Sequence, residues 1–535
     1  MRFDKHFCAR TTVVVALAVA AVSVFGLRSV HAQTRPTVPP AAQAGTTVQR
    51  MSIDDAVAMA LEQNLDLQVQ RINPQLRDLD IAGFEANYTP NLSVTTNLVD
   101  QTQPPSSLLS GNTSQLTTGR STFDFGVNQL TPWYGGSYQV TFSNGRTTTN
   151  NIFTQFDPQL TTNLNASYTQ PLLRNFKIDG VRQQLLVSQK NREIADTQLQ
   201  QSIAVTVRNV RNAYYDLMGA IASLAVQRQS LDLARQSLKD NRARVEIGTM
   251  APLDIVQAEA EVATREEAVI LAEAAIERQQ DQVLALVFNP KSPDFWTARI
   301  EPVDTVTFQP TSVDVDAAVR NALSQRTDIV VAKKNIEAAD VNIRYFDNQS
   351  MPDLNASVIY GAQAIGGVGL LRGPSSGLVP GPITGTVERS YFDTLGVLFG
   401  GDFPGWTFSL DLTYPVGRST SEANEARSRL QRSQQERQLQ SIELQVATQV
   451  RDAARNVQTN AKRVDATRAS RALAEKRLEA EEKRFQAGLT SSFFVLQAQR
   501  DLNVARNSEL LALVEYAKSV VNYSAVQQSP LFGAP

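Results

Sequence analysis

The sequence predicts an α+β membrane protein built from a duplicated unit of helix, strand pair and long helical hairpin. Three observations carry this prediction: residues that recur at fixed offsets, segments in which apolar and polar residues alternate, and a seven-residue apolar repeat. Self-similarity over so long a period indicates a duplicated unit rather than a solenoid of short repeats. The recurring residues are, in the first copy, Ala56, Ala60, Gln63, Asp66, Pro90, Leu92, Val210, Arg244, Gly248 and Gln257, and in the second copy Ala318, Ala322, Gln325, Asp328, Pro352, Leu354, Val450, Arg484, Gly488 and Gln497.

The 535-residue chain carries a formal net charge of −2, so no global field favours binding to nucleic acid. Its N-terminus has basic residues, then an apolar stretch over residues 13–27, then small residues before Gln33. This order is typical of a secretory signal peptide, which we assign to residues 1–32. A membrane anchor is the alternative, but the apolar stretch is short for a helix that spans a bilayer.

Removal of a signal peptide would also remove the only cysteine, Cys8, and both histidines, His6 and His31. The mature chain would then lack thiolate chemistry, Ser-His-Asp catalysis and the usual zinc ligands. The sequence has no Gly-rich phosphate loop that ends in Gly-Lys-Ser/Thr. We therefore expect no enzyme, no cofactor and no metal site.

The rest of the chain divides along the duplication. We expect a flexible leader at residues 33–50, which are rich in proline and small residues. The other predicted segments are repeat 1 at 51–289 with an insertion at 100–160, a connector at 290–312 that is expected to form an equatorial region, repeat 2 at 313–527 with a loop at 361–400, and a C-terminal tail at 528–535.

Each repeat carries two segments in which apolar and polar residues alternate, as they do in a strand. These segments are centred on residues 92–98, 164–168, 354–360 and 406–414. A soluble sheet with one covered face and an outer-membrane barrel both give this pattern, and the soluble sheet is the commoner source. Four strands cannot close a membrane barrel, but three chains would supply about 12 with no open edge in lipid.

Two insertions lie between the paired strands. The first contains alternating segments at residues 123–127 and 138–142 around Gly135 and Gly136, which predict either an added hairpin or a long extension of the main strands. The second, Gly361 to Glu388, is rich in glycine and proline and predicts a loop. We expect both insertions at the same end of the strands, facing the outside of the cell.

The helical hairpins give the clearest periodic signal. Apolar residues stand seven apart from Ile203 to Val245, which predicts coiled-coil packing. No proline occurs over residues 180–247, so a helix of about 70 residues would be on the order of 100 Å long. Arg228, Arg235 and Arg242 fall at the same interval. They predict either a polar seam within the hairpin or a solvated coiled-coil edge.

Gly248 and Gly488 fall where each long helix must reverse. Glycine just past a helix C-terminus supplies a left-handed cap, and Thr249 or Thr490 would help to start the return helix. A glycine of this kind is common in helix turns, but its recurrence in both halves favours a repeated hairpin tip.

The tip residues resemble a known family. The runs from Arg244 to Ala258 and from Arg484 to Ala498 are similar to the hairpin-tip motif of the TolC-like outer-membrane efflux proteins. The stretch Gln170 to Leu173 resembles the strand-to-helix junction of that family. The resemblance covers nearly all of the mature chain.

The resemblance implies a homotrimer with a 12-stranded barrel in the outer membrane and a coiled-coil helical barrel in the periplasm. It also implies docking to a periplasmic adaptor and to an inner-membrane transporter of the RND, ABC or MFS type, in a tripartite efflux or type I secretion system. Adaptor contacts are expected at the tips, namely Arg244, Gly248, Thr249, Arg484, Gly488 and Leu489.

In the family, aspartates at the tips narrow the tunnel. Asp254 matches one of them, whereas Phe494 and Gln497 stand where the second repeat would carry carboxylates. An apolar constriction around Phe494 is our hypothesis, and packing of Phe494 between helices is the alternative. A trimeric coiled-coil adhesin or stalk with a barrel anchor is the alternative to a conduit, but a stalk needs no reversing hairpins.

Overall fold

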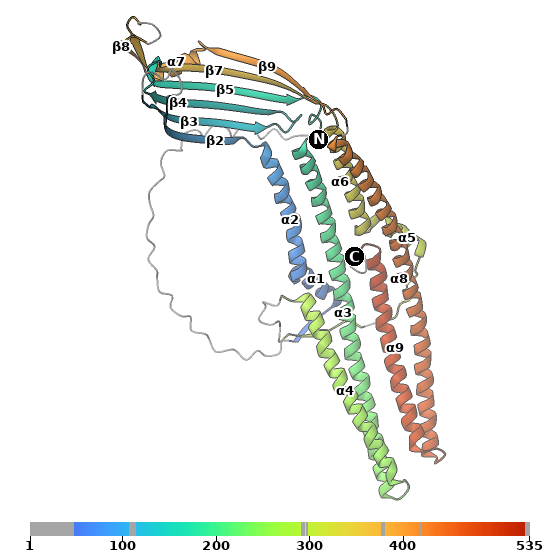
Figure 1. Cartoon of the computed structure of the whole chain (residues 1–535). Helices are drawn as coiled ribbons and strands as arrows, with labels where there is room; N and C mark the ends of the chain where they lie inside the picture. The colour runs from blue at the N-terminus through green and yellow to red at the C-terminus, as the bar shows by residue number, and fades with distance from the viewer. Residues whose placement is uncertain are drawn as a thin grey trace, which may run out of the picture. The chain divides into compact units, whose positions relative to one another are not determined.

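The computed structural model describes residues 48–105, 114–289, 295, 298–305, 307–375, 380–417 and 419–529. The expected signal peptide, most of the leader and most of the C-terminal tail lie outside these residues. The first half, in order, contains β1 (Val48–Met51), α1 (Ile53–Gln63), α2 (Leu65–Glu85), a 3-10 turn (Ala86–Tyr88), β2 (Asn91–Gln103), β3 (Leu116–Leu130), β4 (Ser137–Thr149), β5 (Phe156–Pro171), α3 (Gly180–Glu246) and α4 (Pro252–Val287) (Figure 1). The second half contains β6 (Arg299–Pro302), α5 (Val315–Gln325), α6 (Thr327–Gln349), β7 (Asp353–Arg372), β8 (Ile383–Arg389), α7 (Tyr391–Gly400), β9 (Pro404–Thr413), α8 (Thr420–Gln486) and α9 (Ser492–Val526).

The end of the expected leader forms a strand instead. Val48 to Met51 make β1, which pairs in parallel with β6 of the expected connector. The side chain of Met51 is buried among residues of α3 and α4, and its carbonyl accepts a hydrogen bond from the Tyr214 hydroxyl at 2.9 Å. Burial of Met51 therefore fixes a segment whose composition alone suggests flexibility.

The helical region before the first strand breaks once, at Asn64. The Asn64 amide oxygen caps α2 by accepting from the Leu67 amide at 3.0 Å, and its Nδ2 donates to the Leu286 carbonyl at 2.9 Å. Ser52 and Asp55 form a capping box at the start of α1. The second repeat breaks at the equivalent place, between α5 and α6.

The duplication is confirmed at the level of packing. In the first half, Ala56 and Ala60 of α1 are buried in one cluster with Val210 of α3. In the second half, Ala318 and Ala322 of α5 are buried in one cluster with Val450 of α8. Alanine at these places lets the short helix lie close to the long one, which explains why the same residues recur.

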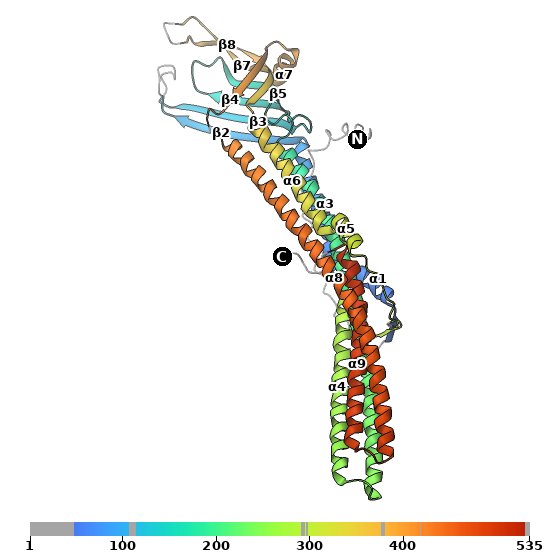
Figure 2. The ribbon, with the colours of Figure 1, turned by 90° about the vertical axis from the view of Figure 1, so that its right-hand side faces the viewer.

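The two long helices are as long as the sequence predicts. α3 and α8 each contain 67 residues, or about 100 Å at about 1.5 Å per residue. Each forms a hairpin with the helix that follows it (Figure 2). Because α3 also packs on α9, the helices lie in the order α4, α3, α9, α8 (Figure 1). None of the helices in the described part of the chain has both the length and the apolar character needed to cross a membrane.

The three arginines at heptad spacing form a solvated edge of the first hairpin, where they pair across to the second helix. Arg228, Arg235 and Arg242 of α3 pair with three glutamates of α4, Glu273, Glu266 and Glu259, at 2.7, 2.8 and 2.7 Å. All six side chains are about half exposed, so each pair contributes little to stability. Their regular spacing follows the heptad repeat of the hairpin.

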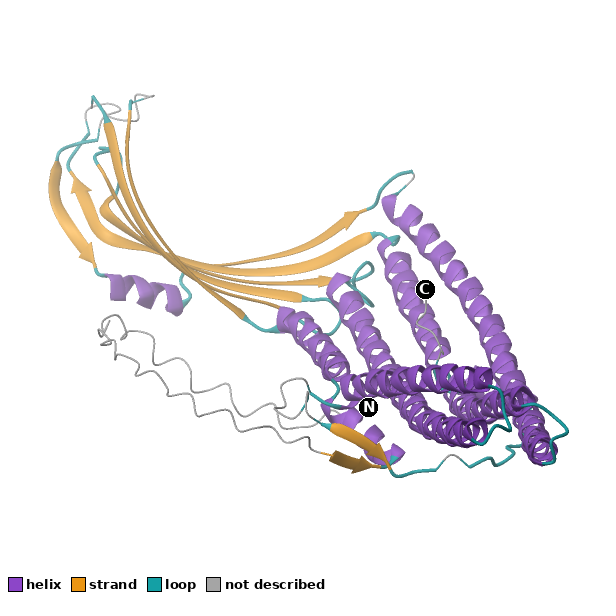
Figure 3. Ribbon diagram, turned by 90° about the horizontal axis from the view of Figure 1, so that it is seen from below, coloured by secondary structure: helices purple, strands orange, loops and turns teal. Residues whose placement is uncertain are grey.

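In the described part of the chain, one antiparallel sheet, orange in Figure 3, carries seven strands. Their order is β2-β3-β4-β5-β7-β8, with β9 also on β7 (Figure 1). The first insertion is thus an added hairpin, β3 and β4, which lies between the expected neighbours β2 and β5. Of the two structures that the sequence allows for this insertion, the added hairpin is the one that the sheet contains. The added strands have no second copy, so the duplication does not predict them.

The expected loop at 361–400 is wrong over much of its length. β7 continues to Arg372, β8 pairs with its outer part, and α7 follows. Residues 376–379 lie outside the described part. Thr394 of α7 fills the space that a Cβ atom at Gly366 would occupy, and the Thr394 side chain is fully buried. Gly366 therefore marks the close approach of a helix rather than a loop.

Candidate functional site at the helical hairpin tips

Both tips turn with the same backbone geometry. Gly248 has φ +79° and Gly488 has φ +74°, in the left-handed region. At the first tip the amides of Gly248 and Thr249 donate to the carbonyls of Val245 and Arg244, both at 2.9 Å. At the second tip the same bonds run from Gly488 to Phe485 at 3.0 Å and from Leu489 to Arg484 at 2.8 Å. These are the two bonds of a Schellman cap, as the duplicated glycines predict.

Thr249 stabilises the end of α3 rather than the start of α4. Its hydroxyl donates to the Arg244 carbonyl at 3.0 Å. The N-cap residue of α4 is Ala251, with Pro252 at the first helical position, and that of α9 is Ser491. Neither N-cap side chain makes a capping bond. The expected role of threonine in starting the return helix is therefore wrong.

The two tips of one chain contact each other through side chains. The Arg244 guanidinium lies over the Phe485 ring, 4.6 Å from its centroid. The buried Ser492 hydroxyl donates to the Asp254 carboxylate at 2.7 Å. Asp254 therefore joins the starts of α4 and α9, and its charge is engaged in the contact between the hairpins.

The other two constriction candidates lie on α9. The Phe494 side chain is 53% exposed and contacts Phe493 edge to face, with ring centroids 5.6 Å apart. The Gln497 amide donates to Asp501 at 2.9 Å, and Asp501 also pairs with Arg477 of α8 at 2.8 Å. Of the three candidates, Phe494 is thus the one with an exposed apolar side chain, whereas Asp254 and Gln497 are held by hydrogen bonds.

Exposed apolar side chains gather at both tips. They are Ile247, Leu253 and Val256 at the first tip and Leu489, Phe493 and Phe494 at the second. Arg484, an expected contact residue, pairs with Glu481 at 3.0 Å on its own helix and keeps more than half of its side chain exposed. A surface of this kind is suited to contact another protein.

A buried ion cluster above the tips was not found from the sequence. Glu261 of α4 is 4% exposed and pairs with Arg265 at 2.6 Å and with Arg500 of α9 at 2.5 Å. Burial works to raise the pKa of Glu261, but the hydrogen bonds from Arg500 and Arg265 outweigh it and hold the pKa below its ordinary value. Glu261 stands seven residues after Asp254, so the heptad spacing was the signal that places both on one face of α4.

A family comparison identifies the chain. The model described as "Outer membrane efflux protein" matches residues 137–287 and 318–525, in two segments that cover more than half of the chain. The chain belongs to this family. It is therefore an outer-membrane channel of an efflux system with a helical part in the periplasm, and the adhesin or stalk alternative is set aside.

Solved structures of outer-membrane proteins, two of them described as channels, share the fold of this efflux protein. CmeC of Campylobacter jejuni aligns with a TM-score of 0.63 and 14% identity over 89% of this chain and 85% of its own. VceC of Vibrio cholerae aligns with a TM-score of 0.61 and 16% identity over 90% of this chain and 97% of its own. MtrE of Neisseria gonorrhoeae aligns with a TM-score of 0.60 and 15% identity over 90% of this chain and 89% of its own. A comparison with curated proteins finds no match.

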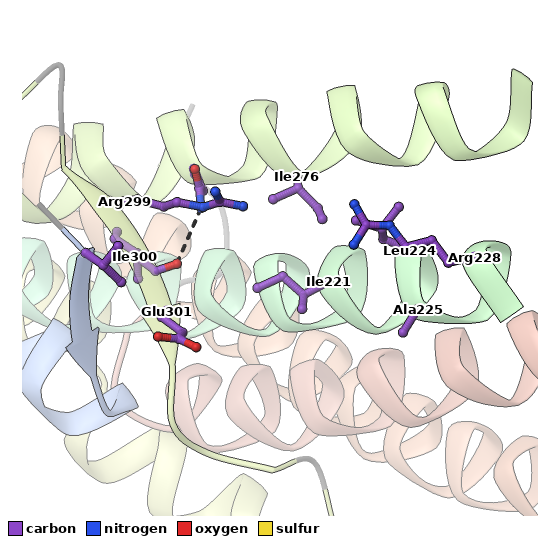
Figure 4. A pocket seen from close by; sticks show the side chains of 10 residues that line it. Ile221, Leu224, Ala225, Arg228, Ile276, Arg299, Ile300 and Glu301 are labelled. Atoms are coloured by element: carbon purple, nitrogen blue, oxygen red, sulfur yellow. Dashed lines mark hydrogen bonds between the residues drawn. The ribbon is translucent and has the colours of Figure 1, made fainter. Parts of the chain in front are cut away.

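A groove between α3, α4 and β6 is lined mainly by apolar side chains, including Ile221, Leu224 and Ile276 (Figure 4). Two of its three charged residues form ion pairs: Arg228 pairs with Glu273, and Glu301 pairs with Arg50. Within the described residues, no group of three or more His, Cys, Asp or Glu side chains is placed to hold a metal ion. Membership in a channel family agrees with the expectation that the chain is not an enzyme.

Proposed function

We propose that this efflux protein is a passive homotrimeric conduit that crosses the outer membrane and the periplasm. The observation that carries the proposal is the open sheet: β2 ends it on one side, β9 ends most of the other, and one face of both strands is apolar and exposed. Unpaired backbone groups are too costly in lipid, so the edges must pair with other chains. The strands lead directly into the helical hairpins, which continue the passage.

The conduit has no energy source of its own, so an inner-membrane transporter of the RND, ABC or MFS type drives export. A periplasmic adaptor joins the two and meets the hairpin tips. Ile247, Leu253 and Leu489 support this assignment, because each is more than 60% exposed next to a rigid turn. Arg244, Thr249, Arg484 and the two turn glycines complete the docking surface.

The tunnel narrows at the tips, and Phe494 supplies the constriction. A hydrophobic ring can close a pore by dewetting. Asp254 is less suited to close it, because its carboxylate accepts a hydrogen bond from Ser492 within the chain. Gln497 is neutral and bonded to Asp501.

Assembly tests the conduit. In detergent, light scattering should give a protein mass close to three times that of the mature chain. A stable monomer that inserts into membranes would contradict the argument from the open sheet edges. The control is a charged variant at one edge, such as Leu410→Glu in β9, which should lower the yield of trimer.

A further inference from the structure

The added hairpin is part of the barrel wall. β3 has 15 residues and β4 has 13, and a transmembrane strand needs about 9–11. The β2–β3 ladder runs from Asn91 opposite Asn128 to Gln103 opposite Leu116. The next two ladders are also continuous, and within the residues that the structure describes no backbone pairing joins β2 to β5. Each added strand is therefore long enough to cross the membrane.

The added strands share the two faces of their neighbours. One row of apolar residues crosses the whole sheet, strand by strand: Leu92, Val127, Val140, Ala166, Tyr360 and Trp406. A polar row on the other face consists of Thr95, Asp124, Ser143, Asn163 and Gln363. In a membrane barrel the apolar row faces lipid and the polar row faces the lumen. A hairpin that projected away from the barrel would not need its apolar and polar faces to line up with those of the neighbouring strands.

The turn of the hairpin is fixed at the end of the sheet where the strands meet the helices. The Tyr134 ring stacks on the Phe176 ring, with centroids 4.8 Å apart. The Gln170 amide donates to the Tyr134 carbonyl at 2.7 Å. Phe176 and Gln170 belong to the junction between β5 and α3, so the turn packs on the same structure that joins the main strands to the helices.

The seven strands occupy six positions across the sheet, because β8 and β9 lie end to end and share one position. β9 pairs with residues 353–362 of β7, and β8 pairs with residues 367–372 of the same strand. The two follow one another along one side of β7, and α7 leaves the wall between them. The sheet therefore has six places, and its outer strands run in opposite directions, so β2 of one chain can pair antiparallel with β9 of the next.

We propose that three chains close an 18-stranded barrel, three times the six places of one chain, rather than a 12-stranded one. The inference rests on the trimer of the proposed function. With strands about 4.8 Å apart and tilted by about 40°, 18 strands enclose a backbone cylinder about 36 Å across, against about 24 Å for 12 strands. Barrels of 16–18 strands leave an aqueous channel. The outer-membrane section thus admits porin-sized solutes, and the hairpin tips are the narrow part of the conduit.

Paired cysteines test the strand order within one chain. The only native cysteine, Cys8, lies in the predicted signal peptide, so the mature chain gives a clean background. In outer membranes treated with an oxidant, Thr95→Cys with Asp124→Cys should form a disulfide, because these residues face each other on β2 and β3. Thr95→Cys with Asn163→Cys should form none, because three strand spacings put them about 14 Å apart, beyond the reach of a disulfide.

A disulfide between residues 95 and 163, with none between 95 and 124, would overturn the inference, because it would place β2 beside β5 and the hairpin outside the wall. Electron cryo-microscopy of the purified full-length assembly completes the test, with 18 strands expected. Three chains around 12 strands would overturn this inference alone. A number of chains other than three would overturn the trimer of the proposed function, whatever the strand order.

Discussion

The two hairpin tips share a turn but differ in chemistry. Both place glycine in the left-handed region and close the cap with the same two backbone bonds. After the turn, the first tip carries Asp254 and the second carries Phe494 at the equivalent position. Asp254 is bonded inside the chain, and Phe494 is exposed. Duplication has thus kept the backbone of the turn, while the side chains differ: Asp254 packs between the hairpins, and Phe494 is free for the closing role that we propose for it.

The largest expected effect comes from the shared turn. Gly248→Val with Gly488→Val puts β-branched residues at φ +79° and +74°. No atom lies within 4 Å of an added Cβ at either place, so the cost is backbone strain of about 1–2 kcal/mol at each turn. Export measured in cells should fall on the order of tenfold or more as the adaptor contact is lost.

Gly83→Val is the matched control for the turn. Gly83 also has open space around an added Cβ, but it lies within α2 at a helical φ. Export by this variant should stay near the wild-type level, and the double variant should still insert its barrel. If the double variant exported normally and crosslinked normally to the adaptor, the hairpin tips would not be the docking surface.

The next effect concerns the ion cluster that joins the hairpins. Glu261→Gln removes a buried carboxylate that accepts from Arg265 and Arg500, so opening of α9 near Arg500 should become easier by about 2 kcal/mol in hydrogen exchange. Glu259→Gln, which breaks the exposed pair with Arg242, should change the opening free energy by less than about 1 kcal/mol. Equal changes in the opening free energy for the two variants would show that burial of Glu261 does not strengthen its ion pairs.

The same cluster gives a pH dependence. The pKa of Glu261 is lowered in the folded chain, so its contribution is present above the ordinary carboxyl pKa and is lost as pH falls through the lowered value. Hydrogen exchange in the wild-type chain should therefore speed up at acid pH at the contact between α4 and α9. In the Glu261→Gln variant, acid pH should no longer speed up hydrogen exchange at this contact. If acid pH speeds up exchange in the variant as much as in the wild-type chain, the pH dependence comes from other titratable groups.

The smallest effect concerns the bond between the tips. Ser492→Ala removes the hydroxyl that donates to Asp254 and should cost about 1 kcal/mol in local opening of the tips. Ser491→Ala is the control, because the Ser491 side chain is exposed and makes no capping bond. Export should be nearly normal in both. A larger effect at residue 491 than at 492 would mean that helix capping, and not the contact between hairpins, is what holds the tips.

Features that occur twice could be predicted from the sequence, and features that occur once could not. The turn glycines, the long helices and the buried alanines of α1 and α5 recur in both halves, so each copy supports the other. The β3–β4 hairpin has no counterpart, and its alternation around Phe123 and Tyr138 allowed two structures. The glycines in the outer part of β7 predict a loop, because glycine often breaks regular structure, whereas in the sheet Gly366 makes room for α7.

The contacts between the tips depend on how the two hairpins lie beside each other. The bond from Ser492 to Asp254 joins residues 238 apart in sequence, and the ion pair of Glu261 with Arg500 joins residues 239 apart. Heptad spacing gives the face of each helix but not the lateral alignment of one hairpin against another. The site residues on each tip were therefore predictable, and their partners across the tips were not.

The conductance of the purified channel in planar bilayers tests most directly the claim that the second tip closes the tunnel. Phe494→Ala should raise the resting conductance, whereas Asp254→Ala should change only ion selectivity, and modestly. Leu253→Ala, which shortens an exposed apolar side chain at the first tip, should leave the conductance near the wild-type level. The claim would be contradicted if multivalent cations blocked the wild-type pore tightly from the periplasmic side, Asp254→Ala abolished that block and Phe494→Ala had no effect.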